Sequence, residues 1–414
     1  AASLGAAQPS AAKVGDMLAI DPSAANAAPP MSDLAPMQTG RAIVSVAHDP
    51  GGVTIAWDDG VRSRFSALWL RDNCACAQCR HPQALERTHV FIDHGRPAVT
   101  DAVLGPDQTL EVRFRVADAA HTSRFTRGWL RAHDVGVRQA ALHRFVPDLW
   151  DAGIASRLPV VGHASFMQTP RGLRAWIEAL KTQGIVLLRG VPTEPGRLRE
   201  VAQRIGPIRA SNFGDFYDVV SMPNPNASAY TALGLELHTD LANWRFPPDV
   251  QLLSCVKSSV RGGESVFADG FRVAADLREA DPTAFELLST WPIEFRFHDA
   301  SCDIRTSAPT LELDRAGRLA RVRFNNWLRT AMAVPDDVVQ PLYAALEQFW
   351  RMLRDEKYRL NLRLEPGDLI AYDNNRILHG RRPFDPTTGE RHLQGCYLNL
   401  DDVDSALRLI ERSA

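Results

Sequence analysis

The chain has 414 residues, and its 47 Lys and Arg against 49 Asp and Glu leave a formal net charge of −2 at pH 7. This balance, without a dense basic cluster, disfavours binding to nucleic acid. No uninterrupted apolar run approaches the roughly 18 residues that a membrane span needs, so we expect no membrane partner. The length suits two domains, and small-molecule chemistry is the function class that these properties favour.

Residues 1–38 predict a disordered tail, because they are rich in Ala, Pro and Ser. They contain no continuous apolar core of the kind that a secretory signal needs. The six cysteines are too unevenly spread for a secreted disulfide framework, since three of them lie close together. A reducing compartment fits this distribution, and we expect the protein to be cytoplasmic.

Residues 39–130 predict a small β-rich N-terminal domain. Alternating apolar and polar residues, separated by turns that contain glycine, indicate short strands. The predicted strands span 42–46, 52–57, 61–65 and 110–116. Residues 131–165 follow this domain and predict a connector.

Three cysteines in this domain have the pattern C-x-C-x-x-C, at Cys74, Cys76 and Cys79. Tight spacing lets one loop supply three thiolates to a tetrahedral ion, so the pattern predicts a structural Zn(II). Spacing leaves the fourth ligand open among His81, His89, His94 and His121. The alternative is a loop of free thiols without metal. A catalytic zinc is disfavoured, because four protein ligands leave no open coordination position.

Residues 166–414 predict a larger α+β domain with strands at both ends and helices between them. Amphipathic periodicity predicts helices at 172–182, 197–204, 271–280, 282–290 and 335–357. Apolar runs predict strands at 184–190, 250–256, 264–268, 321–324, 361–364, 368–372 and 394–398. This order indicates a domain built round a β barrel or sandwich.

A candidate metal site in this domain begins with His238 and Asp240, which stand two residues apart and therefore on one side of an extended segment. His379 is the best candidate for a third ligand. Two histidines and one carboxylate bind Fe(II) on one face and leave coordination positions open. The pair is not specific by itself, because a chain with 12 histidines is expected to show this spacing once by chance.

Several motifs in the same order resemble the γ-butyrobetaine hydroxylase family, which includes trimethyllysine hydroxylases. The resemblance covers about residues 40–410 and rests on Trp-Leu-Arg-Asp-Asn-Cys at 69–74, the cysteine cluster, His-Thr-Asp at 238–240, Gln-Leu-Leu at 251–253, Gly-Gly at 262–263, Phe-Asn-Asn at 324–326 and His-Gly-Arg-Arg at 379–382. It implies a double-stranded β-helix (jelly-roll) catalytic domain with flanking helices, preceded by a zinc-binding domain. It also implies a dioxygenase that uses Fe(II), 2-oxoglutarate and O2.

Matched residue by residue, the resemblance assigns ligands to both metals. Zinc falls to Cys74, Cys76, Cys79 and His121, and iron falls to His238, Asp240 and His379. Arg391 matches the arginine that binds the distal carboxylate of 2-oxoglutarate, and an arginine fork suits a carboxylate. On the residues alone, Arg381 and Arg382 are nearly equal candidates for that role.

The resemblance also implies a cage for a trimethylammonium group, which aromatic faces hold well because the group cannot donate hydrogen bonds. The cage positions fall on Phe213, Tyr217, Tyr230 and Tyr397. Core packing is the alternative for any one of these rings. The human-type enzymes differ in detail, with tyrosine at the position of Phe213, tryptophan at Tyr217 and tyrosine at Leu241. Asn325 or Asn326 is a candidate contact for the anionic end of the substrate.

The implied reaction is hydroxylation of γ-butyrobetaine to carnitine, or of a close trimethylammonium analogue, with release of succinate and CO2. The alternative is the same chemistry on trimethyllysine, trimethylaminoethylphosphonate or a compound without quaternary nitrogen, with the aromatic rings lining an apolar pocket. A different class is a metal-stabilised binding module without turnover. The family also implies a homodimer.

Overall fold

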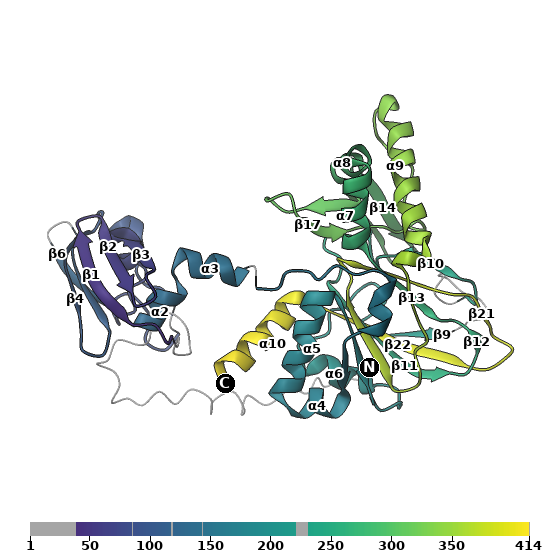
Figure 1. Cartoon of the computed structure of the whole chain (residues 1–414), viewed down its shortest axis with the longest axis horizontal. Helices are drawn as coiled ribbons and strands as arrows, with labels where there is room; N and C mark the ends of the chain where they lie inside the picture. The colour runs from purple at the N-terminus through teal and green to yellow at the C-terminus, as the bar shows by residue number, and fades with distance from the viewer. Residues whose placement is uncertain (1–38, 85, 117–118, 143, 221–230, 414) are drawn as a thin grey trace, which may run out of the picture. The chain divides into compact units, whose positions relative to one another are not determined.

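The structure is a computed structural model that describes residues 39–84, 86–116, 119–142, 144–220 and 231–413 (Figure 1). The chain divides into two compact units, residues 1–144 and 145–414. The tail predicted at 1–38 lies outside the described residues. Over the part of the chain that is described, no helix is both long and apolar enough to cross a bilayer.

The described residues of unit 1 form two three-stranded antiparallel sheets and three α-helices. Alternation puts apolar side chains on one face of each strand, as with the buried Leu110, Val112 and Phe114 of β5. These faces meet in one core that also contains Trp57 and Trp129. The strands are β1 (Ile43–Asp49), β2 (Gly52–Trp57), β3 (Arg62–Ser66), β4 (Ala98–Leu104), β5 (Leu110–Val116) and β6 (Ala119–Phe125); the helices are α1 (Ala67–Asp72), α2 (Arg127–Ala132) and α3 (Val135–Leu142).

Helix α1 leads into the cysteine loop. Ser66 caps the start of the helix, because its side chain accepts a hydrogen bond from the backbone N–H of Trp69. After the helix, the backbone N–H of Cys79 donates to the carbonyl of Cys76 at 2.9 Å. This tight turn brings the sulfur atoms of Cys76 and Cys79 to 3.6 Å.

Unit 2 contains two larger sheets, and their strands pair antiparallel except for β7 with β8. The orders are β7-β8-β19-β11-β22-β9 and β10-β20-β13-β18. Apolar side chains of both sheets, such as Ile370 and Phe267, share one core, as in a double-stranded β-helix. The strands are β7 (Val160–Gly162), β8 (Ile185–Arg189), β9 (Tyr217–Val220), β10 (Leu235–His238), β11 (Val250–Ser258), β13 (Ser265–Asp269), β18 (Leu360–Leu362), β19 (Asp368–Asp373), β20 (Ile377–Arg381) and β22 (Arg391–Leu398).

Four helices pack on the other face of the six-stranded sheet, where Val186 and Leu252 belong to their shared core. In α5, Thr169 caps the start, Pro170 occupies the first turn and Gly184 ends the helix with a φ of 74°. A residue with a side chain rarely adopts that left-handed conformation, so the glycine stops the helix just before β8 begins. The four helices are α4 (His163–Gln168), α5 (Pro170–Gln183), α6 (Arg197–Gln203) and α10 (Leu400–Ser413).

A layer of three helices and two hairpins packs against the four-stranded sheet, with α7, α8 and α9 close together in Figure 1. Alternation along β13 explains the two cores, because Val266 and Ala268 face this layer while Phe267 faces the other sheet. The helices are α7 (Gly270–Ala280), α8 (Pro282–Thr290) and α9 (Asp336–Arg354), and the hairpin strands are β14 (Ile293–His298), β15 (Asp303–Ala308), β16 (Leu311–Leu313) and β17 (Leu319–Val322). A short pair, β12 (Arg261–Gly262) and β21 (Phe384–Asp385), lies outside these layers.

A buried ion pair fixes the turn that leads into β20. The guanidinium of Arg376 lies 2.7 Å from the carboxylate of Asp269, and the side chains are 2% and 0% exposed. Arg376 also donates to the backbone carbonyls of Thr182 and Asp148, so the buried charge is fully engaged. The network sets where β20 begins, and β20 carries His379.

Candidate functional site

Two histidines face each other on neighbouring strands. His238 ends β10 and His379 lies within β20, and the antiparallel register places them directly opposite one another. Opposite residues share a face of the sheet, and here the ring centroids are 4.3 Å apart. Nδ1 of His238 lies 2.8 Å from the carbonyl oxygen of Glu236, which leaves its Nε2 as the nitrogen for a metal.

Asp240 reaches the two histidines through a turn. We expected it to share one side of an extended segment with His238, but β10 ends at His238. Leu241 next to it has a φ of 53°, which is rare for a residue with a side chain. Asn374 accepts from the backbone N–H of Asp240 at 2.8 Å and donates to its carbonyl at 3.1 Å. Oδ1 of Asp240 thereby lies 3.4 Å from Nε2 of His238 and 3.6 Å from Nε2 of His379.

These three side chains fit a divalent metal ion, because their ligand atoms all lie within 4.8 Å of one another. Burial raises the pKa of Asp240, but His379 and His238 outweigh this effect and hold that pKa well below its usual value. Burial, with His238 nearby, lowers the pKa of His379 to about 3. A neutral imidazole and an ionised carboxylate are the states that bind metal. Two nitrogens and one oxygen suit Fe(II), with coordination positions left open.

One tyrosine contacts the Asp240 carboxylate, and a second tyrosine packs on the first. The hydroxyl of Tyr397 donates to Oδ2 of Asp240 at 2.8 Å, and burial raises the pKa of Tyr397 so that it stays a donor. The ring of Tyr217 lies 5.4 Å from that of Tyr397, and its hydroxyl accepts from the amide of Gln251 at 2.7 Å. The Tyr217 ring also covers Gly395, where a Cβ would come within 2.4 Å of it. The two rings therefore form an aromatic pair, which the Tyr397 hydroxyl joins to the candidate metal ligand Asp240.

The other predicted cage residues are placed differently. Phe213 meets Phe297 edge-on, with 5.4 Å between ring centroids, and this is its ring contact among the described residues. Tyr230 lies outside the described residues. The structure therefore brings together Tyr217 and Tyr397 of the four predicted rings.

The two predicted asparagines differ in what their amides do. Asn325 is buried and donates to the backbone carbonyl of Thr239 at 3.2 Å, while its oxygen accepts from the backbone of Trp327 and Leu328. Asn326 is exposed, and its oxygen accepts from Arg329 at 3.2 Å. Asn325 therefore supports the backbone between His238 and Asp240, whereas the exposed Asn326 bonds within its own loop.

Their partners distinguish the three candidate arginines. Arg381 donates to two backbone carbonyls at 2.6 and 2.8 Å, and Arg382 pairs with Glu356 at 2.7 Å. The guanidinium of Arg391 has no hydrogen-bond or ion-pair partner among the described residues and lies 5.7 Å from the ring centroid of Phe384. Burial lowers the pKa of Arg391 to about 10. A half-buried cation without a partner is suited to bind an anion.

In unit 1, the cysteine loop lies against His121 of β6. Nε2 of His121 is 3.2, 3.9 and 3.8 Å from the sulfur atoms of Cys74, Cys76 and Cys79. Tetrahedral zinc with ordinary bond lengths gives ligand-to-ligand distances of about 3.5–3.8 Å. A hydrogen bond from Cys79, together with His121, lowers the pKa of the Cys74 thiol although burial opposes this. The cluster therefore has the donor atoms and the spacing of a closed metal site.

The other three histidines near the loop have partners elsewhere. His89 stacks on His94, with 4.6 Å between ring centroids. Nδ1 of His81 accepts from the backbone N–H groups of Gln83 and Ala84. Among the described histidines, it is His121 that lies with the three thiols.

Glu236 and Asn374 support the His238 cluster, although sequence reasoning gave them no role. The carboxylate of Glu236 binds Nε1 of Trp350 at 3.3 Å and the guanidinium of Arg354 at 2.7 Å, while its backbone carbonyl orients His238. Both residues lie inside the motifs that surround the candidate ligands. A Glu in a strand or an Asn before a turn is too common for position alone to reveal the role.

The double-stranded β-helix and its His-Asp-His cluster define a class, the Fe(II)- and 2-oxoglutarate-dependent oxygenases. Residues 156–397 match the family described as taurine catabolism dioxygenase TauD, TfdA family, and residues 44–131 match gamma-butyrobetaine hydroxylase-like, N-terminal. The chain is 38% identical over 379 residues to the gamma-butyrobetaine dioxygenase of Pseudomonas sp. (strain AK-1), across 89% of this chain and 96% of that relative. The chain belongs to the γ-butyrobetaine hydroxylase family and is a 2-oxoglutarate-dependent dioxygenase.

Further relatives carry two names. The human gamma-butyrobetaine dioxygenase is 33% identical over 369 residues, across 86% of this chain and 94% of that protein. The mitochondrial trimethyllysine dioxygenase of Bos taurus is 31% identical over 360 residues, across 84% and 83%. Among solved structures, asparagine oxygenase in complex with Fe(II), 2S,3S-3-hydroxyasparagine and succinate is 20% identical with a TM-score of 0.44, across 57% of this chain and 79% of that one.

Proposed function

We propose that this dioxygenase hydroxylates γ-butyrobetaine to carnitine, or a close trimethylammonium analogue, with consumption of O2 and 2-oxoglutarate and release of succinate and CO2. The names of the gamma-butyrobetaine dioxygenase relatives support the substrate. The observation that carries the proposal is Tyr397, whose ring pairs with Tyr217 and whose hydroxyl binds Asp240. An aromatic pair so placed holds a quaternary nitrogen a short chain away from the metal-binding carboxylate.

The site residues have distinct tasks in this reaction. His238, Asp240 and His379 would hold Fe(II), which supplies the oxidising chemistry when bound. Arg391 would pair with the distal carboxylate of 2-oxoglutarate, which supplies the anion that its half-buried guanidinium lacks. Tyr397 orients Asp240 and carries one face of the cage, so that substrate and iron ligand are positioned by the same side chain.

We further propose that Cys74, Cys76, Cys79 and His121 bind a structural Zn(II). Four protein ligands fill a tetrahedron and leave no position for substrate. Cys74 and burial raise the pKa of the Cys79 thiol, and the guanidinium of Arg71, which donates to Cys79 at 3.1 Å, opposes this rise. Elemental analysis of the purified protein is expected to give one zinc per chain besides iron, and a chain with iron alone would refute this assignment.

The homodimer expected from the sequence stays a prediction, which sedimentation equilibrium would test.

Succinate formation with a panel of substrates tests the proposed reaction. Turnover of 2-oxoglutarate should rise with γ-butyrobetaine more than with trimethyllysine or trimethylaminoethylphosphonate. The sharpest control is 5,5-dimethylhexanoate, in which carbon replaces the quaternary nitrogen and the shape is kept. If the aromatic pair recognises charge, this neutral-headed isostere should bind about tenfold more weakly or worse. Failure of every trimethylammonium compound would reject the substrate class.

The second candidate, a substrate without quaternary nitrogen, makes the opposite prediction for the same pair of compounds. An apolar pocket should accept 5,5-dimethylhexanoate at least as well as γ-butyrobetaine, because no charge has to be desolvated. Tyr217→Leu separates the two further, since an apolar pocket tolerates leucine and a cation cage does not. Tyr217→Phe is the matched variant, because it keeps the ring and removes the hydroxyl bound to Gln251.

A further inference from the structure

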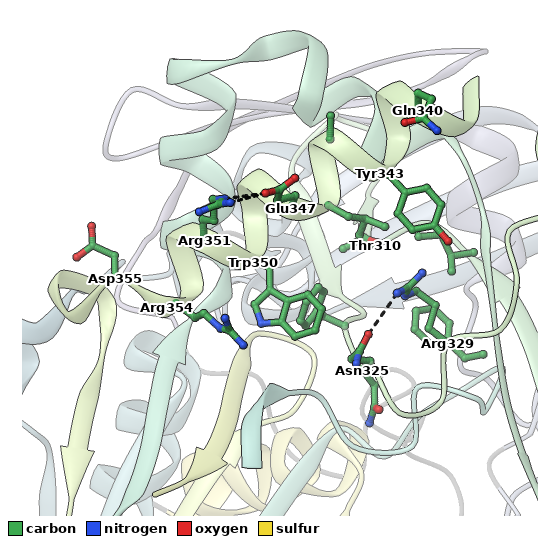
Figure 2. Close-up of a pocket in the computed structure, with 16 residues that line it drawn as sticks. Thr310, Asn325, Arg329, Gln340, Tyr343, Glu347, Trp350, Arg351, Arg354 and Asp355 are labelled. Carbon is green, nitrogen blue, oxygen red and sulfur yellow. Dashed lines mark hydrogen bonds and ion pairs between the residues drawn. The ribbon is translucent and has the colours of Figure 1, made fainter. Parts of the chain in front are cut away.

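A cavity lies in unit 2 on one side of α9. Its volume is about 700 Å³, within the range of small-molecule pockets, and α9 and residues 324–329 form much of its wall (Figure 2). None of His238, Asp240 and His379 lines it. The loop separates the two places, because Trp327 packs edge-on against His238 at 5.1 Å while Arg329 lines the cavity.

The cavity has an aromatic interior. Trp350 stands between Arg354 and Asn325 in Figure 2, and its ring meets Phe324 edge-on at 5.5 Å. The hydrogen bond from its indole nitrogen to Glu236 holds that ring in place. Tyr343 lines the cavity two turns earlier on the same helix and is 44% exposed. Aromatic faces along one helix favour a flat apolar ligand.

One cation of the cavity is left without an acidic partner. Arg351 pairs with Glu347 at 2.5 Å, and Arg354 pairs with Glu236. Arg329 lies over the ring of Tyr343 at 5.6 Å and bonds only to the neutral amide of Asn326, with no carboxylate partner among the described residues. Arg329 therefore gives this end of the cavity a positive charge that a ligand anion can neutralise.

Thr310 is a second, independent sign of a ligand. Its side chain lines the cavity and is 1% exposed, and its hydroxyl has no hydrogen-bond partner among the described residues. A buried hydroxyl without a partner costs free energy, which a polar group of a bound molecule can recover. What distinguishes this hydroxyl is its place, because Thr310 belongs to the wall of a cavity that also contains an arginine without a carboxylate partner.

We propose that this cavity is a second small-molecule site, which binds a carboxylate on an aromatic or similarly flat apolar body. The carboxylate pairs with Arg329, the body lies along the face of α9 that carries Trp350 and Tyr343, and a polar atom of the ligand reaches Thr310. The cavity lies apart from the residues proposed to hold iron and 2-oxoglutarate and from Tyr217 and Tyr397, none of which lines it. Asn325 and Asn326, the candidate contacts for the anionic end of the substrate, do line it, so the two sites adjoin at these asparagines.

The cavity is linked to the iron site because two residues that position the backbone around His238, Glu236 and Asn325, are held by or belong to the cavity wall. Trp350 and Arg354 hold Glu236, whose carbonyl orients His238, and Asn325 in the cavity wall bonds to the carbonyl of Thr239. A ligand that fixes this wall therefore changes metal affinity, and by reciprocity metal changes ligand affinity. This linkage rests on the proposed function, whereas the binding site does not.

Calorimetric titration with 3-phenylpropionate tests the site. The whole chain is loaded with Fe(II), saturating 2-oxoglutarate and saturating γ-butyrobetaine without O2, so that the probe carboxylate cannot be taken up at the iron or in the substrate site. One saturable site is expected, and the neutral amide 3-phenylpropionamide should bind about tenfold more weakly because it lacks the charge. Arg329→Gln should remove that difference, and Thr310→Val should weaken binding without loss of thermal stability.

Arg278→Gln is the matched control, because Arg278 also lies over an aromatic ring, that of Phe285 at 4.7 Å, but outside the cavity. His238→Ala should lose iron yet still bind the probe, which separates this site from the proposed reaction. No saturable binding, equal affinity for acid and amide, or unchanged discrimination in Arg329→Gln would overturn the site. An iron affinity that does not change when the probe is present would overturn the linkage.

Discussion

The two candidate metal clusters differ in how much of the chain each one needs. Three of the four side chains of the cysteine cluster come from one short loop, and only His121 comes from another strand. The second cluster takes His238 from the end of β10, Asp240 from the turn after it and His379 from β20. The first is mostly local, whereas the second exists only when two strands pair in one register.

This difference matches what each cluster can do. Four ligands close a tetrahedron, so the cysteine cluster suits a structural ion that holds a loop to a sheet. Three ligands leave coordination positions open, so the His238 cluster suits a catalytic ion. Tyr397 donates a hydrogen bond to the carboxylate of this cluster. The comparison predicts that damage to one cluster affects chemistry and damage to the other affects folding.

Replacement of His238 is expected to give the largest effect. His238→Ala removes one of three ligands from an open site, so iron binding should weaken and turnover should fall about a thousandfold or more. Zinc content and thermal unfolding should stay close to those of the parent protein. His298→Ala, at the exposed end of β14, is the control. A variant that keeps both iron and succinate production would refute the assignment.

The converse change breaks the cysteine cluster. Cys79→Ser should release zinc and remove several kcal/mol from the stability of unit 1, because metal binding free energy is folding free energy in small closed sites. Zinc analysis and calorimetric unfolding measure both effects, and iron affinity should be retained. Cys302→Ser changes a cysteine outside the cluster and is expected to change neither. Loss of iron together with zinc would mean that the clusters are not independent.

Arg391→Gln is expected to weaken 2-oxoglutarate binding beside the His238 cluster and to leave the cysteine cluster unchanged. Loss of a charge-assisted pair should raise the KM for 2-oxoglutarate about 30-fold to 100-fold, with little change in iron affinity. Arg382→Gln is the matched control, because that guanidinium already pairs with Glu356. If Arg382→Gln gave the larger rise in KM, the two arginines would have to exchange roles.

Asn374→Ala tests how far the open site depends on supports outside the ligand set. Asn374 holds the backbone of Asp240 at both of its polar groups, so its loss should lower iron affinity about tenfold. Asn361→Ala, which removes a surface amide bound to Glu356, provides the control. Equal iron affinity in both variants would show that the turn holds Asp240 without Asn374.

The smallest effect is expected for Tyr397→Phe, which keeps the aromatic face and deletes one hydrogen bond to Asp240. A net loss of about 1 kcal/mol corresponds to a few-fold change in iron affinity or turnover, while KM for a trimethylammonium substrate should change little. Tyr358→Phe removes a similar bond, to Asp276, and serves as control. A large rise in substrate KM in Tyr397→Phe would mean that the hydroxyl, and not the ring, contacts the substrate.

Regular elements were predictable where an apolar pattern is long. The helix expected at 172–182 is α5, and the strands expected at 250–256 and 368–372 are β11 and β19. The strand expected at 321–324 overlaps β17, but β14, β15 and β16 were not predicted, because short strands with charged residues at alternate positions give a weak signal. Helix α10 was also missed, although buried Val403, Ala406 and Leu407 have helical spacing.

The sequence by itself determined the local parts of both sites. Spacing over a few residues fixed the three thiols of the loop and the pairing of His238 with Asp240, because neighbours in the chain cannot move far apart. It also indicated which metals these donor atoms suit. The residues alone left open the fourth zinc ligand and the choice among the three arginines.

Only the tertiary structure decided which distant residues meet. An irregularity in the register of β10 and β20 puts His238 opposite His379, and a shift by one residue would turn one ring to the other face of the sheet. The pairing of β6 with β5 likewise fixes the position of His121. Arg391 stands out from Arg381 and Arg382 because it is half-buried and without a partner, and burial and partners are properties of the packed chain.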